Sequence, residues 1–275
     1  MALDRIVAAF FFVATPASAG DMPMAKIVEQ NGCKGCNLVL RNLRGLYVIE
    51  ADFAGATLRE ADFKGASLAG ANFKGADLQR AEMEKTALVN ANFARAKMRG
   101  VDLEKSNLSR ANFKGADLRD ADVMSATLDG ADLSNTDLRN ASFRRARAHN
   151  AQLTGVMARH TDFERIDATG ADFSGAKMEW SDFDRSNLSG ANLSQSVLKG
   201  LRLTSANLRK ANLSGANLED ALLRRADFSG ADLSGVRGLT QAQLNLACGN
   251  DETVLPRGFD IPECARHAEG EDVTN

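Results

Sequence analysis

Residues 51–80 read ADFAG ATLRE ADFKG ASLAG ANFKG ADLQR, six consecutive five-residue units of one pattern. Each unit has Ala first, a polar residue second and a large apolar residue third. The pattern continues on both sides without an insertion. Of the 40 positions spaced by five residues from Leu38 to Leu233, 37 hold Leu, Phe, Met or Val. The first residue is Ala in 26 of the 37 units that begin between Ala51 and Ala231.

This five-residue period determines the fold class. Neither the 3.6-residue period of an α-helix nor the two-residue period of a strand keeps such a repeat on one face. A chain that turns a corner after every unit does, with the large and small residues pointing inward. Four sides give a coil of about twenty residues, and about ten coils stacked at roughly 4.8 Å give a rod of ~48 Å. The sequence therefore predicts an all-β solenoid.

The unit A(D/N)LxG, repeated without a break, resembles the pentapeptide-repeat family over residues 38–233. The resemblance implies a right-handed quadrilateral parallel β-helix. The ending GLTQAQLNLACG…LPRGFDIPEC also resembles that of many bacterial members of this family.

Three of the large inward positions hold Ala instead: Ala148, Ala158 and Ala168. Val156 and Ile166 occupy the small sites just before the last two, so volume is exchanged within those units. Ala148 follows Ala146 and has no such compensation. We expect a looser core or a distorted corner at Ala148.

A stacked solenoid exposes apolar ends and unpaired backbone, so it needs caps. Thr240 and Gln243 have the spacing of a capping box, and Leu239 and Leu244 that of a hydrophobic staple. Gly249 suits the end of this helix. The sequence therefore predicts a small C-terminal helical cap.

The N-terminal residues have the features of an export signal. Arg5 is followed by the apolar run 6–14, then by Pro16 and the small residues 17–19. We expect cleavage after Ala19 and a periplasmic or secreted protein; a frayed apolar terminus is the alternative. No later segment is apolar enough to cross a membrane, so we expect no membrane insertion of the mature chain.

These features divide the chain into five parts. They are a signal peptide (1–19), an N-terminal lead-in (20–32), the solenoid (33–237), a helical and disulfide cap (238–265) and a disordered tail (266–275).

The four cysteines form two local pairs in the sequence, Cys33 with Cys36 and Cys248 with Cys264. A zinc site normally draws four ligands from two such pairs, but these pairs lie at opposite ends of the rod. A redox pair normally opens a helix in an α/β fold. In an oxidising compartment the remaining interpretation is two structural disulfides, of which the second is the firmer prediction.

No enzymatic constellation emerges from the sequence. His149, His160 and His267 are the only histidines, and none has an acidic or thiol partner at ligand spacing. No glycine-rich phosphate loop precedes a helix. We predict a non-enzymatic protein without a cofactor or a metal site.

The twenty-residue coil sorts the surface charge into columns. One side carries basic residues beside acidic ones, the next carries acidic residues beside basic ones, and the other two sides are nearly neutral. The basic column of the first is Arg59, Arg99, Arg119, Arg139, Arg159 and Lys199, beside Asp77, Asp117 and Asp137; the acidic column of the second is Asp62, Glu82, Asp102, Asp122, Asp162 and Asp182.

This interleaving bears on nucleic-acid partners. Some relatives in the family resemble duplex DNA and bind topoisomerases, which requires a continuous anionic surface. Here the basic columns neutralise the acidic ones, which disfavours that mimicry. The acidic column beside the arginines and the lack of an aromatic stacking platform lead us to expect no nucleic-acid binding either. A cytoplasmic, topoisomerase-binding DNA mimic is the alternative function.

One patch stands out from the repeat. His160 and Trp180 are expected on adjacent coils, with Met157 and Arg159 close by. An exposed Trp is typical of protein contacts, although an incidental Trp covering a distorted corner explains it too. The best interpretation is an exported scaffold or protein-interaction module. Its protein partner and its oligomeric state are not predicted.

Overall fold

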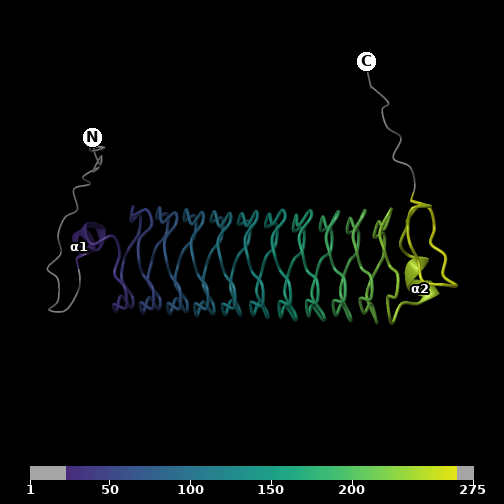
Figure 1. Cartoon of the computed structure of the whole chain (residues 1–275), viewed down its shortest axis with the longest axis horizontal. Coiled ribbons are helices and arrows are strands. Elements are labelled where there is room, and N and C mark those ends of the chain that lie inside the picture. Colours follow the sequence, from purple (N-terminus) through teal and green to yellow (C-terminus); the bar gives the residue numbers. More distant parts are fainter. Residues whose placement is uncertain (1–22, 265–275) are drawn as a thin grey trace, which may run out of the picture.

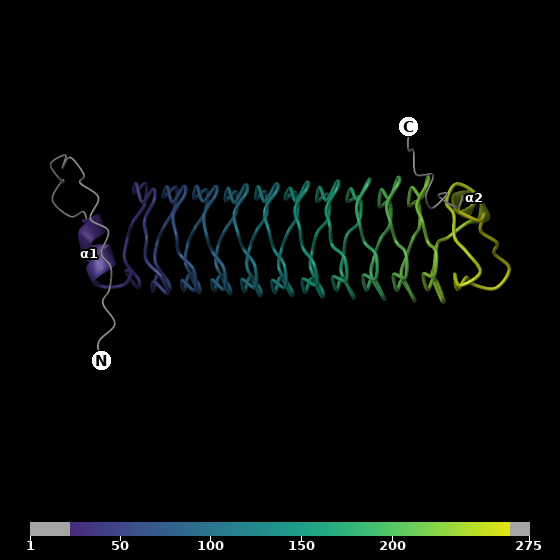
Figure 2. The same cartoon turned by 90° about the horizontal axis from the view of Figure 1, so that it is seen from above.

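Residues 23–264 form a rod of stacked coils in the computed structural model (Figure 1, Figure 2). Two short helices lie at its ends, α1 (Met24–Glu29) and α2 (Gln241–Leu244). The predicted signal peptide, the first residues of the lead-in and the predicted tail lie outside the described residues. Within the described range, no helix has the length and apolarity needed to cross a membrane.

Each coil is joined to the next by parallel bridges between residues twenty positions apart, such as Thr57 with Asp77 and Asp77 with Lys97. The Asp77 amide donates to the carbonyl of Ala56 at 2.9 Å, and the Leu58 amide donates to the carbonyl of Asp77 at 2.7 Å. Bridged residues recur every five positions along the chain, so four bridge columns run along the rod and the coil has four sides. Each side contributes one bridged residue rather than a longer strand. The predicted solenoid with little helix is confirmed at this level.

The corners explain the rest of the repeat. From Gly35 to Gly235, every fifth residue has a positive φ, for example 66° at Gly75 and 56° at Arg80. Glycine recurs there because it alone adopts this conformation without a Cβ penalty. Asp or Asn recurs at the second position because its side chain accepts from the amide two residues on, as Asp172 does from Ser174 at 2.9 Å.

The core is one continuous column of inward side chains. Phe53, Phe73, Phe93 and Phe113 stack in succession with ring centroids 4.9–5.2 Å apart. Further along, Phe163 stacks on Phe143 at 5.2 Å and on Phe183 at 4.5 Å. These rings are fully buried or nearly so.

The expectation of a distorted corner at Ala148 is wrong. The Ala148 amide donates to the carbonyl of Asp167 at 2.7 Å, and φ at Asn150 is 54°, as at the other corners. Ala148 is only 3% exposed. The backbone hydrogen bonds to the next coil hold this corner in the regular geometry.

Helix α1, which the sequence did not predict, covers the N-terminal end of the rod. Its Ile27 is completely buried in the core. The Gly32 amide donates to the Ile27 carbonyl at 2.8 Å, and Gly32 bridges to Asp52 in the next coil.

At the other end the predicted capping box forms. Gln243 accepts from the Thr240 amide at 2.8 Å, and its own amide donates to the Thr240 hydroxyl at 3.3 Å. The Gln243 side chain also donates to the carbonyls of Leu218 and Ala221, which fastens α2 to the last coils.

Helix α2 ends at Leu244, earlier than the end expected at Gly249. The helix ends there because the chain returns to the bridge columns of the rod. The backbone of Cys248 forms a bridge with Asp227, and that of Val254 forms one with Asp232.

Candidate functional site

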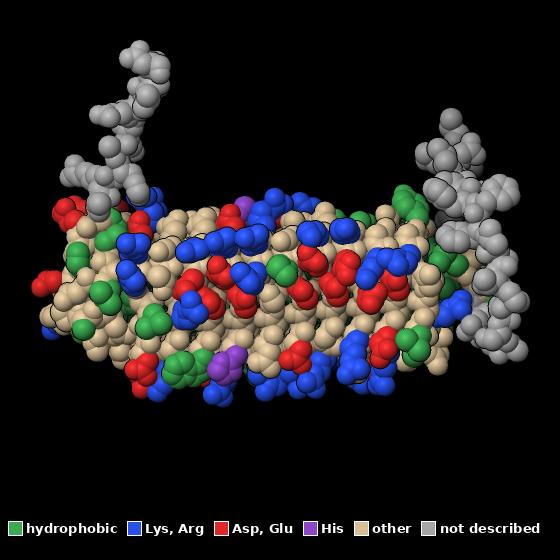
Figure 3. All heavy atoms as spheres, turned by 180° about the vertical axis from the view of Figure 1, so that it is seen from behind, with side chains coloured by type: hydrophobic (Ala, Val, Ile, Leu, Met, Phe, Trp, Pro, Cys, Tyr) green, Lys and Arg blue, Asp and Glu red, His purple; other side chains and the backbone are tan. Residues whose placement is uncertain are grey.

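Charged side chains form interleaved rows along the rod (Figure 3). Many are paired within a coil or with the next coil. On the side with the basic column, Arg119 bonds Asp117 and Arg139 bonds Asp137, each at 2.7 Å. The hydrogen bond from Arg119, opposed in part by burial, lowers the pKa of Asp117.

This pairing is interrupted at Arg159. The position two residues before it holds Met157, where the two preceding coils have Asp117 and Asp137. The same position in the following coil holds Lys177. Within residues 23–264, the side chains of Arg159 and His160 therefore make no hydrogen bond or ion pair.

A surface groove follows the basic column and reaches Arg159 and His160. Its larger part, of about 530 Å³, is lined by Arg59, Glu60, Gln79, Arg80, Arg99, Gly100 and Asp120. The adjoining part, of about 160 Å³, is lined by Arg99, Arg119, Asp120, Arg139, Asn140, Arg159 and His160. The two parts share Arg99 and Asp120, which are joined by an ion pair of 2.8 Å.

Two exposed apolar side chains lie beside the unpaired end of the groove. Met157 is 41% exposed and Trp180 is 45% exposed. The Trp180 ring lies over Gly200, one coil further on, where a Cβ would overlap it. The corner at Trp180 is regular, with φ of 61°. Met157, Arg159, His160 and Trp180, the patch predicted from the sequence, thus lie on one side and corner of two successive coils.

Sequence reasoning missed a second charged cluster, on a side expected to be nearly neutral. His149 Nε2 lies 2.9 Å from Asp167 Oδ2, and Arg147 pairs with Asp129 at 2.7 Å. The expectation that no histidine has an acidic partner is therefore wrong. The partners are separated by about one coil in the sequence, so only a column-by-column comparison would have found them.

Asp167 in this cluster has a lowered pKa. Burial raises the pKa of its carboxyl, but hydrogen bonds from His149 and Thr169 outweigh that effect. The cluster lies on the surface and its basic and acidic side chains alternate, which is the arrangement of a surface ion-pair network.

On the acidic side, Glu84 and Asp102 share a hydrogen bond between their carboxyl groups. Burial is the main cause that raises the pKa of Asp102 to about 6, and the neighbouring Glu84 adds to it. This pair carries a proton at a pH where isolated carboxyl groups have lost theirs.

We expect Asp102→Asn to change the pH dependence of stability. Between pH 3.8, the ordinary pKa, and about 6, the folded chain binds more protons at Asp102 than the unfolded chain. The free energy of unfolding therefore falls as pH rises through this window. Asn keeps the acceptor for the Glu104 amide and does not titrate. At neutral pH the variant should be more stable by about 1 kcal/mol, a value reduced for the exposure of the pair.

Thermal melts at about pH 4 and pH 7 measure this effect. Asp132→Asn is the matched control, because Asp132 accepts the equivalent hydrogen bond from Ser134 at 2.9 Å on a neutral side. Equal changes in the two variants would contradict the assignment to Asp102.

The four cysteines lie in two pairs at disulfide-bonding distance. The Cα atoms of Cys33 and Cys36 are 5.6 Å apart, and those of Cys248 and Cys264 are 4.7 Å apart. The structure thus pairs them as predicted from the sequence, one pair at each end of the rod.

Comparison with protein families gives one match. A model described as pentapeptide repeats, in 8 copies, matches residues 42–86, 87–123, 124–156, 149–185, 161–200 and 202–237. No curated protein matches the chain.

Solved structures of pentapeptide repeat proteins are also similar. HetL from the cyanobacterium Nostoc, described as involved in heterocyst differentiation regulation, is 29% identical over 80% of this chain and 92% of its own, with a TM-score of 0.37. A protein from the Arabidopsis thaliana thylakoid lumen is 28% identical over 50% of this chain and 74% of its own, with a TM-score of 0.17. QnrB1, a plasmid-mediated fluoroquinolone resistance protein, is 16% identical over 79% and 90%, with a TM-score of 0.27.

Proposed function

The chain belongs to the pentapeptide-repeat family, and we propose that it is an exported, non-enzymatic solenoid that binds another protein. We also infer that its four-sided coil is right-handed, the form that family membership implies. The rod acts as a rigid support, because backbone bridges fix the backbone of each coil relative to the next.

One observation carries the proposed binding role. Arg159 and His160 have no side-chain partner within the described residues, in a column where the preceding arginines are paired. They lie beside the exposed side chains of Met157 and Trp180. Arg and Trp are the residues most often responsible for binding energy at protein interfaces. A carboxylate from a partner would supply the ion pair that Arg159 lacks.

Two features of the chain support export. The sequence before residue 20 has the pattern of a cleavable signal. The cysteines pair locally at both ends of the rod, as is typical of proteins from oxidising compartments. Fractionated cells should yield a periplasmic product that starts at Gly20 and has no free thiol. A cytoplasmic product with Met1 and four free thiols would instead favour the DNA-mimic alternative.

The charge pattern weakens that alternative. Lys64 pairs with Glu82 at 3.0 Å, and Arg202 pairs with Asp182 at 3.2 Å. These ion pairs interrupt the continuous anionic surface that DNA mimicry requires.

Site-specific crosslinking in living cells tests the binding role. We expect a photoreactive residue at His160 to form one discrete protein adduct. Trp180→Ala should reduce the adduct about tenfold, the effect of losing a contact worth about 1.4 kcal/mol. Met157→Asp should also reduce it, because it gives Arg159 the partner that Arg119 and Arg139 have.

Two controls separate binding from folding. A photoreactive residue at Ser174, on a neutral side, should give no adduct. Leu222→Ala removes a side chain that is 55% exposed at another site and should leave the His160 adduct unchanged. Adducts of equal yield in all variants, or none at His160, would rule out this surface as the contact site.

A further inference from the structure

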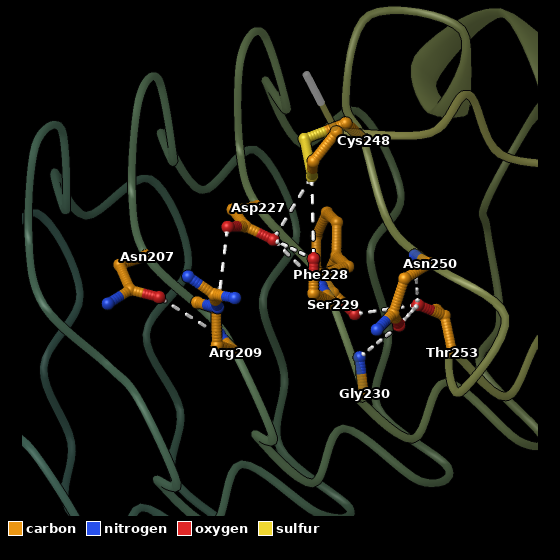
Figure 4. The surroundings of a disulfide bond; sticks show 10 residues. Asn207, Arg209, Asp227, Phe228, Ser229, Gly230, Cys248, Asn250 and Thr253 are labelled. Carbon is orange, nitrogen blue, oxygen red and sulfur yellow. Dashed lines mark hydrogen bonds and ion pairs between the residues drawn. A yellow bond between two sulfur atoms is a disulfide. The ribbon is translucent and has the colours of Figure 1, made fainter. Parts of the chain in front are cut away.

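The C-terminal disulfide lies against a carboxylate (Figure 4). Cys248 belongs to the cap and bridges to Asp227 in the last coil. Cys264 is held beside it, because its amide donates to the carbonyl of Gly249 at 2.9 Å. Three separate segments of the chain therefore meet at one point.

The contact between Asp227 and Cys264 is not explained by the disulfide. Asp227 Oδ1 is 3.2 Å from Cys264 Sγ. A disulfide sulfur carries no proton, so it cannot donate a hydrogen bond to this oxygen. The Ser229 hydroxyl lies 3.5 Å from the same sulfur and donates to Asp227 Oδ1 at 2.6 Å. Carboxylate, hydroxyl and sulfur atoms thus converge at this point.

The same three residues bring potential metal-ligand atoms close together. One donor atom each from Asp227, Cys248 and Cys264 lies within 4.8 Å of the other two. Among residues 23–264 this is the one group of three such residues. The Cys33–Cys36 pair, by contrast, belongs to no such group.

We propose that reduction of the Cys248–Cys264 disulfide creates a zinc site formed by Asp227, Cys248 and Cys264. A dithiol reductant transfers two electrons and two protons to the disulfide and leaves as its own disulfide. The resulting thiols lose both protons when the metal binds. Two thiolates and one carboxylate then hold the ion, with the Ser229 hydroxyl or water as the fourth ligand.

The sulfur–oxygen distance is near that of tetrahedral zinc. Zinc–sulfur and zinc–oxygen bonds of about 2.3 and 2.1 Å place sulfur and oxygen ligands about 3.6 Å apart. The Sγ–Oδ1 distance of 3.2 Å is close to this value. Once the S–S bond is broken, rotation of the Cys264 side chain separates the sulfurs to the ligand spacing. Thiolates favour zinc over magnesium or calcium.

The surrounding residues already orient the carboxylate. The Ser229 amide donates to Asp227 Oδ1 at 2.9 Å, and Arg209 lies 3.8 Å from Oδ2. Such supporting contacts tune metal affinity. The disulfide joins two segments of the cap, and zinc would join the same two segments to Asp227 in the last coil, so the cap can remain closed in either redox state.

Metal titration of the full mature chain tests this proposal. After reduction with a phosphine, we expect one equivalent of zinc to bind, and cobalt to give a sulfur-to-metal charge-transfer band. The oxidised protein should bind neither ion. Cys264→Ser should abolish the band, and Asp227→Asn should weaken zinc binding at least about tenfold.

The other cysteine pair provides the matched control. The double variant Cys33→Ser, Cys36→Ser should bind zinc as the wild type does. In the reduced wild type, zinc should protect Cys248 and Cys264 from alkylation and leave Cys33 and Cys36 reactive. Circular dichroism checks that each variant is folded. The proposal is overturned if the reduced, folded protein binds no zinc, if Asp227→Asn binds as tightly as wild type, or if protection falls on Cys33 and Cys36.

Discussion

Replacing Phe163 with Ala is expected to lower the free energy of unfolding by about 4 kcal/mol. Its ring lies between those of Phe143 and Phe183, with centroid distances of 5.2 and 4.5 Å, and meets Phe173 edge-on at 6.3 Å. The site cannot collapse around the cavity, because every coil is held by bridges on both sides. Ala148, Ala158 and Ala168 already reduce the core volume nearby. Chemical denaturation measures the loss.

Phe163→Leu is the matched control. Leu203 and Leu223 hold the equivalent position in later coils, so Leu fits the backbone and should cost about 1 to 1.5 kcal/mol. A similar loss for Ala and Leu would show that ring stacking and volume are not what stabilise this region.

Loss of the C-terminal disulfide is expected to cost about 3 kcal/mol. Cys248 and Cys264 are 16 residues apart, and closing a loop of that length restricts the unfolded chain by roughly this amount. The double variant Cys248→Ser, Cys264→Ser, measured with a chelator present, should show this loss. Hydrogen exchange should quicken at the amides of Phe228 and Leu233, which donate to the cap at 2.8 Å.

Removal of the N-terminal disulfide is the comparison for this prediction. Cys33 and Cys36 are separated by only 3 residues, so the same relation predicts about 2 kcal/mol. Their removal should leave exchange at Phe228 and Leu233 unchanged. Equal losses from the two pairs, or unchanged exchange at Phe228 without the C-terminal pair, would contradict a role for that disulfide in fastening the cap.

The repeat made most of the fold predictable, because one five-residue rule places every inward side chain. Ala51 and Phe53 are both fully buried, as their positions in the unit require. The capping box at Thr240 was predictable for a similar reason, since it depends on residues three positions apart.

Features that depend on contacts outside the repeat rule were not predictable in the same way. Helix α1 has six residues, too few to show a helical period, and only the burial of Ile27 reveals its role. The pairing of His149 with Asp167 depends on side-chain torsions as well as on the coil length. The isolation of Arg159 likewise becomes clear only when its neighbours are seen to be paired.

The bridges between residues twenty positions apart divide the rod into coils of equal height. Deleting one whole coil, such as residues 87–106, would bring equivalent bridge positions together and leave both caps in place. The distance between the caps therefore changes only in steps of about 4.8 Å, the spacing of neighbouring strands. A partner that touches both ends would distinguish chains that differ by a single coil. The number of coils encoded in the sequence would then determine which partner binds.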